Sequence, residues 1–148
     1  DMSQNNRIYC ASDHGGVELK DAVIRHLDAR GYDVHDLGAH GTESVDYPDF
    51  GALLANRLKD AVGAVGVAIC GSGIGISIAA NRHSWIRAAL VHDETTARLA
   101  RQHNDANIIA LGERTMGTAT ALNCVDIFLD TGFEGGRHQR RVDKLTNL

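Results

Sequence analysis

Residues 70–75 place a cysteine directly before a glycine-rich turn, in the order Cys-Gly-Ser-Gly-Ile-Gly. The apolar run 64–69 before this turn predicts a buried strand, and residues 76–82 after it predict the start of a helix. Glycines allow a sharp turn that presents backbone N–H groups, and a helix N-terminus favours negative charge. Cys70 is therefore a candidate thiolate, although many free cysteines are only small buried core residues.

The glycine loop does not match the common phosphate- and nucleotide-binding motifs. A P-loop continues Gly-Lys-Ser/Thr, whereas Gly75 is followed by Ile76. The dinucleotide fingerprint G-x-G-x-x-G follows a first strand, whereas this loop reads G-x-G-x-G after the third. A thiol phosphatase loop has an arginine at the position of Ile76. The loop is thus expected to stabilise an oxyanion at a reacting centre rather than to hold a phosphate.

Basic residues near the C-terminus offer another place for an anion. Arg137 and Arg141 are four positions apart, which puts them on one face of a predicted helix. Their like charges repel unless they share an anion, so the pair either binds a phosphate or belongs to a solvated basic tail. The formal net charge of −4 argues against a nucleic-acid partner.

Histidines are the other candidates for proton transfer. His14 follows the first predicted strand and His103 precedes the fifth, and each could act or be merely structural. His35 and His40 could be imagined as metal ligands with Asp36, but no third and fourth ligands occur at suitable spacing. The sequence therefore predicts no metal site.

The cysteine content bears on the compartment. Cys10, Cys70 and Cys124 form an odd, widely spaced set without a CxxC pair, which argues against a disulfide framework. Cys10 and Cys124 lack the glycine-rich surroundings of Cys70 and are expected to be inert. We expect a cytoplasmic protein, because that compartment is reducing and neither a signal peptide nor a membrane span is visible.

Strand and helix patterns alternate along the chain of 148 residues, a length that suits one domain. The strands are expected at 7–12, 33–38, 64–69, 87–92 and 107–112, and the helices at 17–30, 49–62 (with Asp49 as N-cap), 76–81, 94–102, 116–129 and from 137 onward. This alternation predicts an α/β, three-layer Rossmann-like fold whose five-stranded parallel sheet has helices on both faces. Residues 1–6 are expected to be a flexible tail, and residues 7–148 the single domain.

The carboxyl ends of parallel strands are where α/β proteins bind ligands. Residues 13–16 follow the first predicted strand and residues 70–73 the third, so these two loops are expected to share one edge of the sheet. Residues 103–104 lie just before the fifth strand. The first two loops are the candidate site.

Five motifs in order give the chain a specific resemblance over residues 8 to about 142. They are Asp13-His14-Gly15-Gly16, Asp46-Tyr47-Pro48, Cys70-Gly71-Ser72-Gly73-Ile74-Gly75-Ile76-Ser77-Ile78-Ala79-Ala80-Asn81, Arg101-Gln102-His103-Asn104-Asp105 and Glu134-Gly135-Gly136-Arg137-His138. Together they resemble the B-type ribose-5-phosphate isomerase family, which includes galactose-6-phosphate isomerase subunits. The resemblance implies a metal-free aldose–ketose isomerase that needs no cofactor and acts on a sugar phosphate through an enediol(ate).

Matching positions imply a role for each motif residue. Cys70 is expected to be the base between C1 and C2, and His103 to help open the furanose ring with Asp13 near the ring oxygens. The remaining expected roles are oxyanion stabilisation by Ser72 and the amides of Gly71, Gly73 and Gly75, sugar contacts by Tyr47 and Asn104, and phosphate binding by His14, Arg137, Arg141 and Arg114. The resemblance further implies a homodimer or dimer of dimers with shared sites, in which the C-terminal helix packs on the partner and its arginines serve the partner's site.

Two branch points qualify the resemblance. Many members have threonine at the position of Ser72, so serine keeps the hydroxyl but loses the methyl that restricts its rotamer. Another branch lacks the cysteine and has glutamate at the position of Ile76, which places this chain in the thiol branch.

Three readings of the function remain open on the sequence. The leading one is interconversion of D-ribose 5-phosphate and D-ribulose 5-phosphate in the pentose phosphate pathway. The second is isomerisation of a six-carbon aldose 6-phosphate of the allose or galactose type. The third is a non-catalytic sugar-phosphate-binding module, because a fold does not determine a function.

Overall fold

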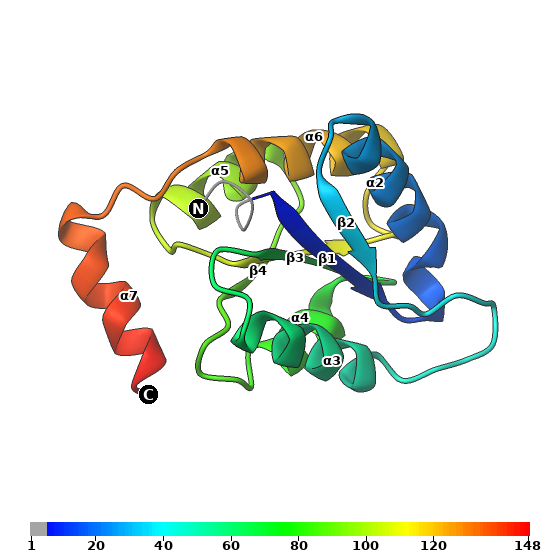
Figure 1. The fold of residues 1–148 in the computed structure, drawn as a ribbon, viewed down its shortest axis with the longest axis horizontal. Helices are drawn as coiled ribbons and strands as arrows, with labels where there is room; N and C mark the ends of the chain where they lie inside the picture. Colours follow the sequence, from blue (N-terminus) through cyan, green and yellow to red (C-terminus); the bar gives the residue numbers. More distant parts are fainter. Residues whose placement is uncertain (1–5) are drawn as a thin grey trace.

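A parallel sheet forms the centre of the molecule in a computed structural model that describes residues 6–148 (Figure 1). The strands are β1 (Arg7–Ser12), β2 (Asp33–Asp36), β3 (Val65–Cys70), β4 (Ala88–Leu90) and β5 (Ile108–Gly112), and all neighbours pair parallel in the order β2-β1-β3-β5-β4. The predicted sheet is confirmed. Residues 1–5 of the expected tail lie outside the described residues, and the Asn6 carbonyl accepts a hydrogen bond from the Asp33 N–H.

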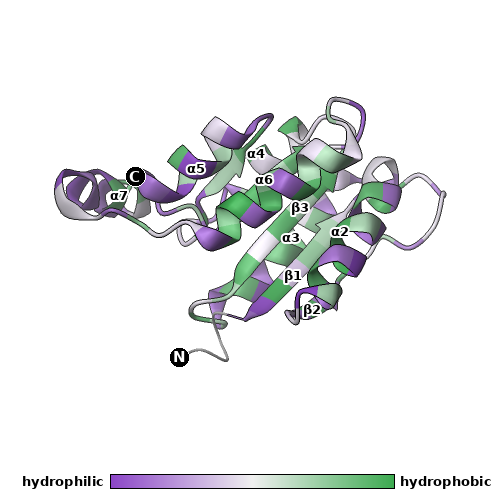
Figure 2. Ribbon diagram, turned by 90° about the horizontal axis from the view of Figure 1, so that it is seen from above, coloured by the Kyte–Doolittle hydropathy of each residue, from purple (hydrophilic) through white to green (hydrophobic). Residues whose placement is uncertain are grey.

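Helices cover both faces of the sheet, as predicted. Figure 1 shows α2 (Val17–Ala29), α5 (Glu94–Gln102) and α6 (Thr118–Asp130) on one face, and α3 (Tyr47–Lys59) and α4 (Ile74–Ala80) on the other. Alternate strand residues enter the two resulting cores: Ile8 and Cys10 pack on the first side, Tyr9 and Ala11 on the second. Burial on both faces explains why the strands are nearly continuous hydrophobic runs, which Figure 2 makes visible along β1 and β3.

Helix α3 begins two residues before Asp49, which the sequence suggested as its N-cap. Asp46 is the N-cap, in an extended conformation, and Tyr47 is the first helical residue. Pro48 lies in the first turn, where a helix leaves N–H groups unpaired and the missing donor of proline costs nothing. The early start places Tyr47 at the end of the helix that faces the candidate site.

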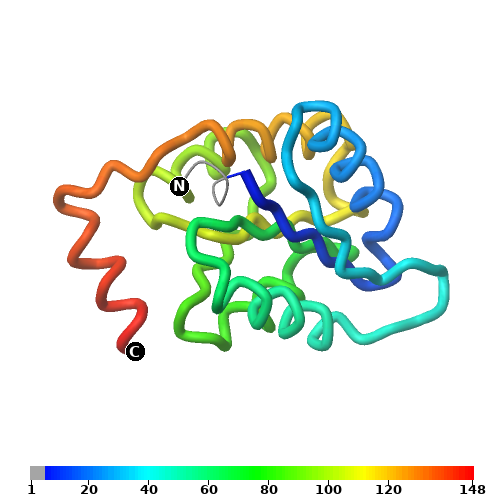
Figure 3. The backbone as a smooth tube through the Cα atoms, in the orientation of Figure 1, coloured from blue at the N-terminus to red at the C-terminus, as the bar shows by residue number. Residues whose placement is uncertain are grey.

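The C-terminal segment differs from the single predicted helix. A 3₁₀ turn, η2 (Gly136–His138), precedes the α-helix α7 (Gln139–Thr146). In Figures 1 and 3, α7 stands away from the sheet on the side of the strands' amino ends. No helix within residues 6–148 has the length and apolar character that a membrane span requires.

A buried ion pair fixes the strand ends next to the candidate site. The Lys20 side chain is fully buried, and its Nζ donates a 2.7 Å hydrogen bond to Asp36 Oδ1. The same oxygen accepts from the Gly38 N–H at 2.9 Å, and the Gly38 carbonyl accepts from the Ser12 N–H. Lys20 therefore holds the segment after β2 against the end of β1, immediately before Asp13.

Replacing Lys20 with alanine is expected to lower the free energy of unfolding by about 2 kcal/mol. Breaking a fully buried pair costs about 3–5 kcal/mol, and the cost is lower here because the Asp36 side chain is 31% exposed and solvent screens its unpaired charge. Urea unfolding measures the change, with the exposed Glu18→Ala on the same helix as control. A loss within about 0.5 kcal/mol, typical of surface sites, would contradict the role of the pair.

Candidate active site

The carboxyl ends of β1 and β3 form one edge where the strand order changes direction, the place where open α/β sheets bind ligands. Ser12 pairs with Ile69, so Asp13 and Cys70 come next on adjacent strands. The Asp13 N–H donates to the Ile69 carbonyl at 3.2 Å. The structure thus brings the first two predicted loops together at this edge.

The Cys70 thiol is held by the glycine turn. Cys70 is the last residue of β3 and is 4% exposed, and its Sγ accepts a hydrogen bond from the Gly73 N–H at 3.1 Å. Gly73 has φ +77°, and a Cβ there would lie 2.9 Å from the backbone of Leu111. Only glycine suits this position, and the turn starts α4 at Ile74 rather than at the predicted Ile76. The Gly73 N–H can stabilise negative charge on the Cys70 sulfur.

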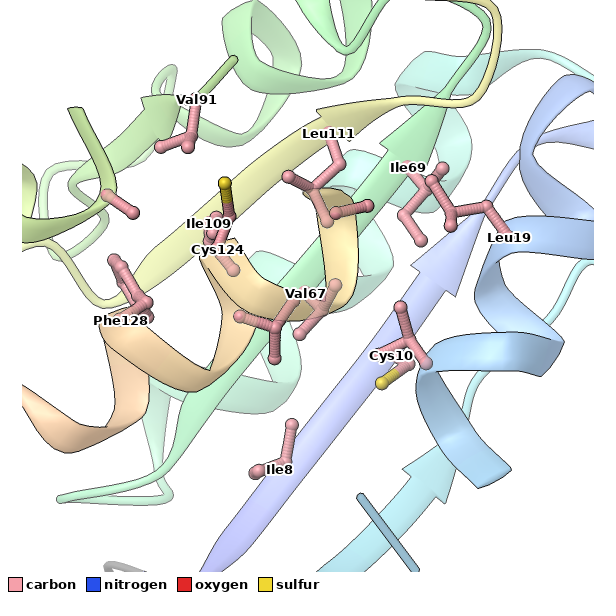
Figure 4. Close-up of a cluster of buried hydrophobic side chains, with 14 of the residues drawn as sticks. Ile8, Cys10, Leu19, Val67, Ile69, Val91, Ile109, Leu111, Cys124 and Phe128 are labelled. Atoms are coloured by element: carbon pink, nitrogen blue, oxygen red, sulfur yellow. The ribbon is translucent and has the colours of Figure 1, made fainter. Parts of the chain in front are cut away.

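The other two thiols lie in the hydrophobic core. Cys10 and Cys124 are fully buried among the aliphatic side chains seen in Figure 4. Burial raises the pKa of Cys10 to about 12 and that of Cys124 to about 11. Both stay protonated under ordinary conditions, as the sequence predicted for inert cysteines.

Iodoacetamide at about pH 8 is therefore expected to alkylate Cys70 before the other two cysteines in the folded protein, because a thiolate is the reactive form. Peptide mass spectrometry measures the order of labelling. Labelling in denaturant, where all three should react alike, is the control. If Cys10 or Cys124 were alkylated as fast as Cys70 in the folded state, Cys70 would not be the reactive thiol.

The residues after Cys70 pack against the loop that follows β5. The Ser72 Oγ accepts a hydrogen bond from the Ile74 N–H at 3.2 Å. The Arg114 N–H donates to the Gly71 carbonyl at 2.9 Å, and a Cβ at Gly71 would lie 3.4 Å from Arg114 Nε. The exposed Arg114 side chain thus lies over Gly71, beside the thiol turn.

Asp13, His14 and Tyr47 border the same turn. Asp13 caps a short 3₁₀ turn, η1 (His14–Gly16), by accepting from the Gly15 N–H at 2.9 Å. The exposed His14 ring has Nδ1 3.1 Å from the Val45 backbone nitrogen. A methyl group at Gly75 would lie 2.6 Å from the Tyr47 ring, so the absence of a side chain at Gly75 lets the ring approach. We call this set the thiol half-site: Asp13, His14, Tyr47, Cys70, Gly71, Ser72, Gly73, Gly75 and Arg114.

A second set of predicted residues gathers around the end of α5. His103 is the C-cap of α5, and its ring stacks on His138 with ring centroids 4.3 Å apart. The Glu134 N–H donates to the Gln102 carbonyl at 3.0 Å and ties the C-terminal segment to α5. We call this set the histidine half-site: His103, Asn104, Glu134, Arg137, His138 and Arg141.

The two half-sites lie at opposite edges of the sheet within one chain. Cys70 pairs with Gly112 at the carboxyl end of β5, whereas His103 precedes its amino end at Ile108. The four steps of β5 alone span about 13 Å at about 3.3 Å per residue. One chain therefore does not bring His103 and Asn104 to Cys70, although sequence reasoning assigned them to one reaction.

The arginine pair differs from its prediction in geometry. Arg137 lies in η2 and Arg141 in α7, so they do not share one regular α-helix. Both side chains are exposed, and neither they nor Arg114 form an ion pair among residues 6–148. Their guanidinium groups remain available for an anion.

Sequence reasoning gave no role to Glu134 and His138, although both lie in a motif that carried the resemblance. His138 is buried, and its Nε2 lies 3.4 Å from Glu134 Oε1. Membership of that motif and the i, i+4 spacing of the two residues were the available signals, and neither reveals the contact between His138 and His103.

Comparison with known proteins gives a consistent result. The family model described as Ribose/Galactose Isomerase matches residues 8–145. The chain is 41% identical over 142 residues to ribose-5-phosphate isomerase B of Escherichia coli (strain K12), covering 96% of this chain and 95% of that protein. The structure of ribose-5-phosphate isomerase B from Clostridium thermocellum is 50% identical with a TM-score of 0.92, covering 95% of each chain.

A further solved structure contains a ligand. The ribose-5-phosphate isomerase B of Mycoplasma genitalium, with bound ribulose 5-phosphate, is 43% identical to this chain with a TM-score of 0.92, covering 95% of this chain and 94% of that one. High identity and near-complete coverage in sequence and structure agree with the order of the five motifs. This chain belongs to the ribose/galactose isomerase family.

Proposed function

We propose that this protein interconverts D-ribose 5-phosphate and D-ribulose 5-phosphate, a step of the pentose phosphate pathway, with Cys70 as the base. The observation that carries the proposal is the Cys70 thiol, which accepts the Gly73 N–H at the sheet edge where Asp13 and Ser72 converge. Family membership supports it, as does the related Mycoplasma genitalium protein that holds ribulose 5-phosphate.

The chemistry moves one proton between adjacent carbons. In the open-chain aldose, the Cys70 thiolate removes the proton from C2, and the electron pair of the C2–H bond forms the C1–C2 double bond while O1 becomes an oxyanion. N–H groups of the Gly71–Gly75 turn and the Ser72 hydroxyl stabilise that charge; loss of one such donor typically costs about 10²–10³ in rate. The electron pair of the C1–C2 double bond then takes the proton back from the Cys70 thiol at C1. The O2–H electron pair forms the C2 carbonyl, and the proton released from O2 passes to O1, which ends as a hydroxyl.

We further propose that two copies of the chain share each active site in a homodimer or a dimer of dimers. The separation of the half-sites supports this, because the thiol half-site lacks the ring-opening histidine and the arginine pair within its own chain. C₂ symmetry would let the histidine half-site of each copy complete the thiol half-site of the other. His103 of the partner subunit then opens the ring above Cys70.

Surface features support the assembly. A groove of about 490 Å³ separates α7 from the α4–β4 connection and is lined by Asn104 and Leu145. Ile74 and Ile78 on α4 are 50% and 60% exposed, so apolar surface lies beside the thiol half-site. A second copy would bury both features, with α7 packing on the partner.

Phosphate binding is proposed for His14 and Arg114 of one copy with Arg137 and Arg141 of the other. Hydrogen bonds to a charged group contribute about 1.5–3 kcal/mol each. A clamp on the non-reacting phosphate can orient C1 and C2 at the thiol, so that remote binding energy accelerates the reaction. A cytoplasmic location is part of the proposal, since the three free thiols suit a reducing compartment.

The substrate is tested by comparing kcat/KM for ribose 5-phosphate with that for allose 6-phosphate and galactose 6-phosphate. The proposal expects the five-carbon substrate to be preferred at least about 10-fold, the discrimination that one extra carbon unit typically gives. A preference for a six-carbon phosphate would support the second reading of the sequence. Binding of all three without turnover would identify a non-catalytic binding module.

A further inference from the structure

His138 contributes a buried ring to the histidine half-site that the mechanism above does not use. The His103 and His138 rings are stacked 4.3 Å apart with an interplanar angle of 16°. Glu134 Oε1 lies 3.4 Å from His138 Nε2 and 3.9 Å from His103 Nε2, so one carboxylate faces both rings. Three ionisable groups therefore meet where His103 would contact the sugar.

The arrangement suits a stacked pair better than a metal site. The three ligand atoms lie within 4.8 Å of one another, which is close enough to consider an ion. A histidine binds a metal along a direction in its ring plane, at about 2.0–2.1 Å for zinc. Two stacked planes only 16° from parallel do not converge at such a distance. Metal binding would require His103 to leave the stack.

The charges around His138 favour its neutral form. Burial lowers the pKa of His138 below its usual range, and the nearby His103, Arg137 and Arg141 act in the same direction, while Glu134 opposes them. These charged groups lie at the C-cap of α5, in the segment before η2, in η2 itself and in α7. A neutral His138 lies flat against His103 without like-charge repulsion.

The stack also restricts the motion of His103. The His103 side chain is 38% exposed, so solvent alone would leave it free to rotate, whereas the His138 side chain is 9% exposed. The His138 N–H donates to the Gly135 carbonyl, and the Glu134 N–H donates to the Gln102 carbonyl next to His103. These two hydrogen bonds tie the segment that carries the buried His138 to the end of α5, where the more exposed His103 lies.

We propose that His138 is a positioning residue for ring opening: its ring and the Glu134 carboxylate hold His103 in the orientation that exchanges a proton with the furanose. The inference rests on the proposed function. In ring opening, the C1–O4 bond breaks, O4 gains a proton from His103, and the O1 hydroxyl loses its proton to Asp13, which yields the C1 aldehyde and an O4 hydroxyl. Cys70 takes no part in this step.

Two reactions of the same enzyme separate ring opening from proton transfer. Conversion of ribose 5-phosphate begins with a furanose and needs both steps. Exchange of the C1 hydrogen of ribulose 5-phosphate with D₂O needs only Cys70, because the phosphate on O5 keeps that ketose open. In His138→Ala, conversion is expected to fall at least about 10-fold, at the lower end of the effect of a general acid–base group. Exchange should stay within about twofold of wild type.

Matched variants and outcomes make the test decisive. His138→Phe keeps a flat ring and should recover most of the conversion, whereas the exposed Gln139→Ala should change neither reaction. Equal losses of conversion and exchange in His138→Ala, or no loss of conversion, would overturn the role of His138. If the wild-type protein neither converts nor exchanges its substrates, the proposed function itself fails, which is a distinct result.

Discussion

Replacing Cys70 with alanine is expected to lower kcat for ribose 5-phosphate by at least about 10³-fold, within the about 10²–10⁴-fold range of general acid–base catalysis. The thiol is the only group of the thiol half-site proposed to remove the C2 proton. The residues proposed to bind the phosphate do not include Cys70, so the affinity for the sugar phosphate should change little. Steady-state kinetics and calorimetric titration with ribose 5-phosphate measure the two quantities.

Cys124→Ala is the matched control for this variant. It deletes the same thiol from another buried position, in the core on the opposite face of the sheet from the core that contains Cys70. Its kcat should stay near that of wild type even if its stability falls. Retained turnover in Cys70→Ala would exclude the thiol as the base, and a Cys124→Ala variant that is equally inactive would attribute the loss to folding.

Mixing two inactive variants is expected to restore activity. Cys70→Ala damages one half-site and His103→Ala the other, and random exchange of subunits makes about half of the dimers mixed. In a C₂ dimer with shared sites, each mixed dimer carries one site with both residues intact, so about a quarter of wild-type activity should return. The measurement is turnover after the variants are unfolded together and refolded.

The same mixture distinguishes the alternative arrangement. If Cys70 and His103 of one chain served one site, no combination of the two variants would contain an intact site and no activity would return. A mixture of Cys70→Ala with wild type is the control: it measures how activity changes when wild-type subunits are mixed with inactive ones. Recovery without mixed dimers, checked by native mass spectrometry, would contradict the shared site.

The main features of the fold could be predicted because strand and helix patterns are local. The apolar strands and amphipathic helices predicted the parallel sheet and its two helical layers. The predicted start of α3 was wrong because Pro48 is compatible with the first turn of a helix. The predicted start of α4 was wrong because the chain turns at Gly73, soon after β3, and the helix begins at Ile74. Both errors concern backbone geometry at an element boundary, where periodicity carries little information.

Only part of the candidate site could be predicted from the sequence, and the reason is physical. Asp13 and Cys70 follow adjacent parallel strands, so a general rule of parallel sheets brings them together. His103 follows α5, which returns to the opposite edge, and the proposed contact with a second copy of the chain would leave no periodic trace in the sequence. The stack with His138 depends on the path of residues 131–138, which sequence spacing does not determine.

A crystal structure with ribulose 5-phosphate is the most direct test of the central claim, that one sugar phosphate is held by the thiol half-site of one chain and the histidine half-site of another. The account predicts that Cys70 Sγ lies within about 3.5 Å of C1 or C2, the distance of a reactive contact, and that Arg137 and Arg141 of the partner subunit bind the phosphate. A sugar phosphate bound without Cys70, or held by one chain alone, would contradict it.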